Sequence, residues 1–276
     1  MSSQSGADAP LRRSSSPDSS RSLVIALAWT VTAVPLMVLG AVLFALVPGV
    51  TWWQGLVVGA LIGVVLIALR LRGALTRLLG VVGAEPADDD RHARFFNLAE
   101  GLSLAAGIPR PELYVVDDEG RNAAAVAWGD RSAIVATSGL LANLDRINME
   151  GIVAEALVQI EAGDAESATV GASLFAPLLR GPVAAVTTPV AGYGLRRLFA
   201  SDRDLAADRA AVALTRYPPG LHGALGLIRA GSPVLAKLSP ATDHIWLVDP
   251  SGGEQQGEPA VVRAPLDLRI DVLGEF

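Results

Sequence analysis

The chain has 276 residues, a formal net charge of −6 at neutral pH and no cysteine. Apolar residues make up 51% of it, and its mean hydropathy of +0.42 is high for a water-soluble protein. The acidic balance argues against a general nucleic-acid binder, which needs a basic face. The absence of cysteine excludes disulfides, thiolate metal sites and cysteine nucleophiles.

The N-terminal residues 1–22 are rich in serine, proline and aspartate and poor in large apolar side chains. Such a segment buries too little apolar surface to offset the entropy lost on ordering, so we expect a disordered tail. The apolar run that follows is too long for a signal peptide and lacks a small-residue cleavage site.

Two long apolar runs come next. Leu23–Val47 contains no charged residue, and at about 1.5 Å per residue it is long enough to cross a bilayer core of about 30 Å. Pro35 is expected to kink this helix, which a membrane helix tolerates. The second run, Gln54–Leu69, follows after a Pro-Gly turn. We predict a transmembrane helical hairpin over residues 23–71, in preference to a hairpin buried in a soluble core.

The residues around this hairpin predict its orientation. The turn between the runs carries two tryptophans, Trp52 and Trp53, which are typical of the membrane interface, and no basic residue. Arginines precede the first run and follow the second: Arg12, Arg13, Arg21, Arg70, Arg72 and Arg77. By the positive-inside rule both ends lie in the cytoplasm, and so does the domain that follows. We therefore expect a multi-pass protein of the cell membrane.

A polar linker, residues 83–90, leads to a domain over residues 91–276. A helix is predicted in ARFFNLAEGLSLAAGI, which has helical spacing and ends at Gly107 and Pro109. Three short strands are predicted in ELYVVDD, NAAAVAWGD and SAIVATSG. Later helices are predicted in INMEGIVAEALVQIEAG, SDRDLAADRAAVALTRY and PPGLHGALGLIRAG, before a loop-rich finish. The expected fold class is α+β, with a small sheet beside helices.

Residues 168–195 are apolar again, but an Arg-Gly-Pro sequence at 180–182 divides them into two pieces. Each piece is short for a membrane span. We expect a helical hairpin that is either buried in the domain or dips into the membrane, and the sequence leaves both possibilities open.

Several blocks between Arg94 and Leu273 follow one another in a recognisable order. They are NLAEGLSLAAGIPRPELYVVDD, NAAAVAWGDRSAIVATSGLLANL, GIVAEALVQIEAGD, RDLAADRAAVALT, HIWLVDP and APLDLRI. In order and spacing they resemble the HtpX family of membrane zinc metallopeptidases, relatives of the CAAX prenyl protease. The resemblance implies a mainly helical zincin domain, a zinc cofactor and a role in membrane-protein quality control.

The zinc motif of that family, HExxH, is replaced in this chain. HExxH places two histidines at i and i+4 on one helix face as zinc ligands, with a glutamate as general base. The matching segment here is EALVQ, residues 155–159. The resemblance puts Asp204 at the position of the third ligand, a glutamate in the family. It puts Asp208 at the position of an aspartate that supports a ligating histidine.

Each replacement removes part of the expected chemistry. Ala156 has no proton acceptor, so the residue that would activate water is missing. Gln159 offers a neutral amide oxygen, a poor zinc ligand beside imidazole. The three histidines, His92, His222 and His244, lie outside this helix and share no ligand spacing. We therefore expect neither a catalytic residue nor a cofactor.

Two interpretations of the degenerate positions stay open. In the first, Glu155 and Gln159 form a hydrogen-bonded polar patch on an otherwise apolar helix. In the second, Glu155, Asp204 and Asp208 converge, and their repulsion is relieved by a proton, an arginine, or a bound Mg²⁺ or Ca²⁺. The arginine that would serve is Arg203 or Arg209.

The resulting hypothesis is a catalytically inactive, membrane-anchored pseudopeptidase that acts as a binding, scaffold or regulatory protein. The alternative is an active zinc metalloendopeptidase with an atypical ligand set. Expected partners are the lipid bilayer, an extended peptide or membrane-protein client, and an active relative, with no nucleic acid. An extended peptide would add as a strand along an edge formed by Asn122, Ala123, Ala124 and Ala125.

Overall fold

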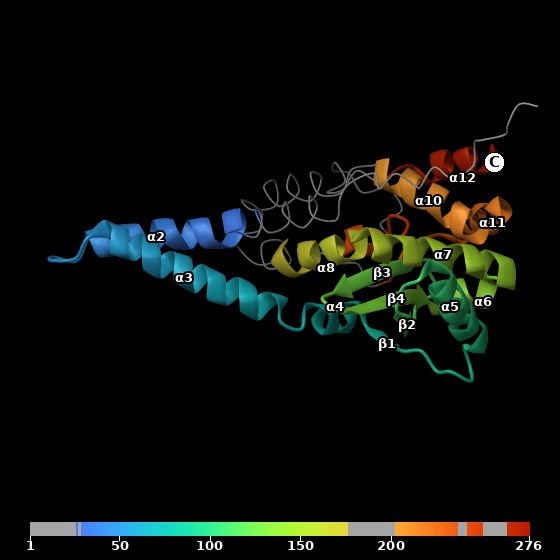
Figure 1. The fold of residues 1–276 in the computed structure, drawn as a ribbon, viewed down its shortest axis with the longest axis horizontal. Helices are drawn as coiled ribbons and strands as arrows, with labels where there is room; N and C mark the ends of the chain where they lie inside the picture. The colour runs from blue at the N-terminus through green and yellow to red at the C-terminus, as the bar shows by residue number, and fades with distance from the viewer. Residues whose placement is uncertain (1–25, 27–28, 176–201, 237–241, 251–263) are drawn as a thin grey trace, which may run out of the picture.

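The computed structural model of the chain describes residue 26 and residues 29–175, 202–236, 242–250 and 264–276. The predicted disordered tail, residues 1–22, lies outside the described residues. The second predicted hairpin, residues 168–195, lies outside them from residue 176 onward. Figure 1 shows two long helices extending from one end of a domain in which a small sheet lies among helices.

Two packed helices form the N-terminal part. A π-helical turn, η1 (Trp29–Ala33), leads into α2 (Val34–Ala45), and α3 spans Trp52–Leu71. Pro35 lies in the first turn of α2. Because proline cannot donate a backbone hydrogen bond, the ladder is interrupted there, directly after the π-helical turn, and the kink expected at this residue stays a prediction.

α2 and α3 run antiparallel, and glycines on their facing sides let the two helices approach each other closely. Gly55, Gly59 and Gly63 recur every fourth residue on α3 and are buried. A Cβ on Gly55 would lie 2.1 Å from the carbonyl oxygen of Gly40, and one on Gly59 would lie 2.3 Å from that of Leu36. Among the residues that the structure describes, α3 is the one helix long and apolar enough to cross a membrane, and α2 is shorter.

The sheet has four strands: β1 (Ala84–Pro86), β2 (Glu112–Val116), β3 (Ala123–Trp128) and β4 (Arg131–Thr137). Their order is β1-β2-β4-β3. The β2–β4 pair is parallel, and the two outer pairs are antiparallel. The three predicted strands are confirmed. β1 lies within the predicted linker, because three residues ending in proline carry too little pattern to predict an edge strand.

Helices make up most of the rest. They are α4 (Ala74–Val82), α5 (Ala93–Ala106), α6 (Ser138–Asn143), α7 (Arg146–Ala162), α8 (Asp164–Phe175), α10 (Asp202–Thr215), α11 (Pro218–Gly231), the 3₁₀ turn η2 (Asp243–Ile245) and α12 (Leu266–Gly274). The helices predicted at α5, α7, α10 and α11 are confirmed. The prediction of a loop-rich C-terminal segment was wrong at Leu266–Gly274, which form α12.

The side chains of the sheet belong to two hydrophobic clusters, one on each side of the strands. Alternate strand side chains, such as Ala125 and Ile134, pack into a core with α5, α7 and α11. The others, such as Val126 and Val135, face α4 and α8. Because β3 is mostly alanine, its small side chains let α7 pack on one side of the strand and α8 on the other. The α+β fold class is confirmed.

Candidate functional site

The degenerate motif lies in the middle of α7. The carboxylate of Asp145 accepts a hydrogen bond from the backbone N–H of Asn148 and starts this helix, and Gly163 ends it with a left-handed φ of 79°. Glu155 and Gln159 lie one turn apart on the same face, and Glu155 is only 3% exposed. The Nε2 of Gln159 donates to Oε1 of Glu155 at 2.5 Å. The hydrogen-bonded patch predicted for these two residues is confirmed.

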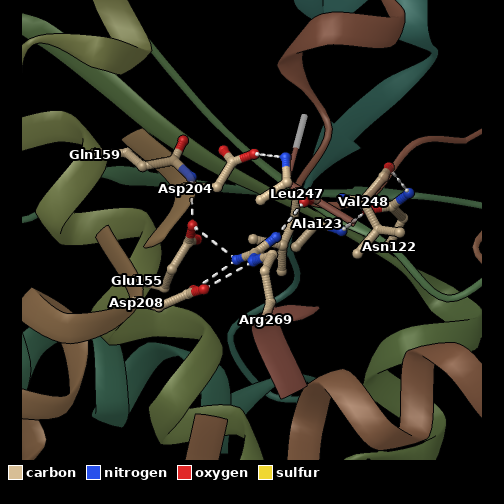
Figure 2. Close-up of polar contacts among 10 residues, drawn as sticks. Asn122, Ala123, Glu155, Gln159, Asp204, Asp208, Leu247, Val248 and Arg269 are labelled. Carbon is tan, nitrogen blue, oxygen red and sulfur yellow. Dashed lines mark hydrogen bonds and ion pairs between the residues drawn. The ribbon is translucent and has the colours of Figure 1, made fainter. Parts of the chain in front are cut away.

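The positive charge beside Glu155 comes from the C-terminal helix. Arg269 on α12 is buried and donates from Nε and Nη2 to the two carboxylate oxygens of Asp208 on α10, at 2.8 and 2.6 Å. Its Nη2 lies 3.7 Å from Oε1 of Glu155, and its Nη1 donates to the carbonyl of Leu247 at 2.8 Å. Figure 2 shows the guanidinium pointing between these groups. One side chain therefore joins α7, α10, α12 and the segment at residue 247.

The prediction that Arg203 or Arg209 balances the charge of the carboxylates was wrong. Arg203 pairs with Asp164 at 3.1 Å, and Arg209 is exposed on α10. They were chosen because they are sequence neighbours of Asp204 and Asp208, whereas Arg269 is 61 residues away from Asp208. No local signal in the sequence pointed to Arg269, because it lies in a segment that was predicted to be loop-rich.

The carboxylates do converge, as predicted. Asp204 lies one turn before Asp208 on α10, and its Oδ2 accepts a hydrogen bond from the backbone N–H of Ala264 at 3.0 Å. Burial raises the pKa of Glu155 to about 7, against the opposing charge of Arg269, and the charges of Asp208 and Asp204 add to the rise.

The guanidinium remains charged in this setting. Burial opposes the charge on Arg269, but its hydrogen bonds to Asp208 and the surrounding carboxylates outweigh burial and hold its pKa above the usual range. The cluster therefore combines one fixed positive charge with carboxylates of which Glu155 is poised to take up a proton near neutral pH.

These residues do not fit the zinc ion that the family resemblance implies. The positions of the two ligating histidines hold a carboxylate, Glu155, and an amide, Gln159, which are bonded to each other. The position of the base holds Ala156, whose methyl group is buried in the core. Within the described part of the chain, no three histidine, aspartate or glutamate side chains are grouped so that they could hold a metal ion.

The histidine with the most buried ring lies elsewhere. His244, in η2, has its Nε2 2.9 Å from the carbonyl oxygen of Ala168 on α8. It thus contributes a hydrogen bond to the layer on the other side of the sheet from the degenerate motif.

The predicted peptide-binding edge is paired within the chain. β3 is the outer strand of the sheet, but Ala124 forms an antiparallel bridge with Trp246. The backbone N–H of Leu247 donates to the carbonyl of Ala123 at 2.7 Å. The side chain of Asn122 donates to the carbonyl of Val248 at 2.7 Å and accepts from its N–H at 3.2 Å.

The same edge is also covered further along β3. The backbone N–H of Ala127 donates to the hydroxyl of Thr169 on α8 at 3.1 Å. A peptide that added as a strand at residues 122–125 would therefore have to displace residues 246–248, which are buried.

No protein-family model and no solved structure matches the chain. Several curated relatives do. A Protease HtpX homolog of Dictyoglomus thermophilum is 29% identical over 203 residues, which cover 64% of this chain and 67% of the relative. One from Dictyoglomus turgidum is 26% identical over 220 residues, covering 70% and 72%. One from Streptococcus thermophilus is 22% identical over an alignment that covers 90% of this chain and 96% of the relative.

Proposed function

Because the chain belongs to the HtpX-like family of proteases, we propose that it is a membrane-anchored member that has lost peptidase activity and acts by binding. The observation that carries this proposal is the bonded pair Glu155–Gln159 at the positions of the zinc-binding histidines. Arg269 supplies the positive charge to the same cluster. In this proposal the chain keeps the family's fold around a site whose groups satisfy one another.

Peptide hydrolysis needs a group that takes a proton from water. Ala156 offers none. Glu155 titrates near neutral pH, but it is buried, accepts the hydrogen bond of Gln159 and faces Arg269. In this proposal a carboxylate that is buried and already engaged by Gln159 and Arg269 does not replace the missing base, and Ala156 does not either.

The membrane anchor in this proposal is the pair α2 and α3. The side chains on their outer faces are large and apolar, and many are exposed, among them Leu39, Val42, Leu61, Val65 and Leu69. In water such a surface would be costly, whereas lipid tails cover it without cost. We propose that both helices span the cell membrane and that the domain lies in the cytoplasm, as the flanking arginines predict.

The binding partners that we propose are a membrane-protein client or an active member of the family, in membrane-protein quality control. The edge of β3 at residues 122–125 serves an extended peptide in this scheme only if residues 246–248 are displaced. A client that binds without such displacement would use another surface of the domain.

The test measures zinc and hydrolysis on the same preparation. The full chain is purified in detergent, dialysed without chelator, and analysed for metal by plasma mass spectrometry and for casein cleavage with and without a chelator. We expect zinc far below one ion per chain and no chelator-sensitive cleavage. Near-stoichiometric zinc together with such cleavage would contradict the proposal and support an active metalloendopeptidase with an atypical ligand set.

A restored motif provides the positive control. Glu155→His, Ala156→Glu, Gln159→His and Asp204→Glu together recreate the ligands and base of the family. We expect this variant to retain zinc under the same dialysis. The comparison separates a chain that lacks the ligands from a preparation that has simply lost its metal.

A further inference from the structure

Two arginines at the corner between α3 and α4 have no partner in the described part of the chain. Arg70 lies in the last turn of α3, and Arg72 follows the end of that helix. Neither guanidinium makes a hydrogen bond or an ion pair among the residues that the structure describes. No aspartate or glutamate occurs between Asp18 and Glu85, so no acidic residue nearby in the sequence compensates them.

The third arginine of the corner is used within the fold. The guanidinium of Arg77 donates to the carbonyl oxygens of Leu69 and Arg70 at the end of α3. Carbonyls in the last turn of a helix have no partner in the helix and carry its negative dipole end, so a cation there is favourable. Arg77 thus fixes the geometry of the corner and leaves the charges of Arg70 and Arg72 available.

The corner is held rigidly against the domain. Gly73 turns the chain with a left-handed φ of 69°, and α4 begins at the next residue. Leu75 and Leu78 of α4 pack into the core formed with α8 and the sheet. Arg131 of β4 donates to the hydroxyl of Thr76 at 3.3 Å. The positions of Arg70 and Arg72 relative to the domain are therefore defined by packing.

The length of α3 places these arginines at a defined depth. The helix has 20 residues, which at about 1.5 Å each matches a hydrocarbon core of about 30 Å. It begins with Trp52 and Trp53, which are 59% and 53% exposed. With these tryptophans in one interface, Arg70 and Arg72 reach the headgroup layer of the opposite leaflet, on the side of the domain.

From this geometry we propose that Arg70 and Arg72 bind the phosphate group of an anionic phospholipid in the leaflet that faces the domain. A guanidinium matches phosphate well, because its planar N–H groups donate in pairs. Two uncompensated positive charges favour a headgroup with net negative charge over phosphatidylcholine, whose phosphate is neutralised by its own choline group. The proposal rests on the membrane anchoring proposed above but adds a lipid class, since an apolar helix inserts into neutral lipid without any anionic headgroup.

The experiment compares lipid retention by the full chain and two double variants. Each protein is reconstituted in vesicles of phosphatidylcholine with a minor fraction of phosphatidylglycerol, tested by flotation, then gently extracted and analysed by native mass spectrometry. The test variant is Arg70→Gln with Arg72→Gln. The matched control is Arg146→Gln with Arg209→Gln, two exposed arginines of α7 and α10.

We expect the unaltered chain and the control to retain phosphatidylglycerol in preference to phosphatidylcholine. In the test variant that preference should fall by up to about fivefold per arginine, the factor that corresponds to about 1 kcal/mol. Added inorganic phosphate should not displace the lipid. Equal retention by the test variant, or displacement by free phosphate, would overturn the inference while flotation still supported the anchor. If the protein does not float together with the vesicles, the proposed membrane anchoring is contradicted as well.

Discussion

At the scale of single residues, Arg269 and Asp208 form a buried pair in which each charge depends on the other. Their side chains are 2% and 1% exposed, and two hydrogen bonds join them. Removing one partner of such a pair leaves the other charge buried without compensation, which costs about 3–5 kcal/mol. We therefore expect Arg269→Ala to lower the free energy of unfolding by about this amount, measured by denaturant titration in detergent.

The same helix offers a control for that prediction. Arg229 and Asp267 form an ion pair with side chains 54% and 77% exposed, and Asp267 belongs to α12. Exposed pairs contribute about 0–1 kcal/mol, so Arg229→Ala should change the stability little. If both variants lost a similar amount of unfolding free energy, the burial of Arg269 would not be the cause of the loss.

Glu155 makes stability depend on pH in a direction set by its raised pKa. That pKa is about 7 in the folded chain, against an ordinary value of 4.5. The folded state therefore binds this proton more tightly than the unfolded state, and stability falls as the pH rises from about 4.5 through about 7. The loss from this group is at most about 3 kcal/mol. In Glu155→Gln the slope of unfolding free energy against pH should flatten over that range, and an unchanged slope would contradict the assignment.

The residues of this cluster differ in how far the sequence could predict them. Glu155 and Gln159 were predictable partners, because side chains four residues apart share one face of a helix. The family resemblance predicted that these two residues lie close to Asp204 and Asp208 in space. Arg269 was not predictable as the partner, because no local rule links residues 61 positions apart; only the return of α12 onto α10 brings them together.

At the scale of elements, α2 and α3 test how far glycine determines the hairpin. A Cβ on Gly59 would lie 2.3 Å from a backbone oxygen of α2, which cannot move without separating the helices. We expect Gly59→Leu to destabilise the pair by about 1–3 kcal/mol or more, seen as a lower unfolding temperature in detergent. In contrast, Gly80→Ala on α4 meets nothing within 4 Å and should not lower it, since alanine favours a helix.

Elements with clear end signals were predicted well, and weakly marked ones were missed. α5 ends at Gly107 and α7 at Gly163, both with left-handed φ, where a glycine after an apolar helical pattern predicts the stop. β1 and α12 have three and nine residues. Such short elements form because neighbouring elements pair with them or pack on them, and their own sequences show too few repeats of either period to reveal it.

At the scale of the whole molecule, the last described segments return to close the domain. Residues 246–248 pair with the edge of β3, and α12 brings Arg269 to the cluster between α7 and α10. The sequence predicted an open edge because the strand pattern of β3 gives no sign of what lies beside it. Such closure depends on contacts between distant parts of the chain, as does the pairing of Arg269.

Because of this closure we expect that the folded chain does not depend on a metal ion. The helices that a zinc ion would join are already joined through Arg269, so we expect a chelator to leave the unfolding temperature of the unaltered chain unchanged. In the variant with Glu155→His, Ala156→Glu, Gln159→His and Asp204→Glu, zinc at a concentration of about 100 times its Kd would add about 2.7 kcal/mol, which the chelator removes. Thermal unfolding of both proteins with and without chelator provides the measurement. If the chelator lowers the unfolding temperature of the unaltered chain as well, a bound ion contributes to its fold, and the guanidinium of Arg269 is not the cation on which the cluster depends.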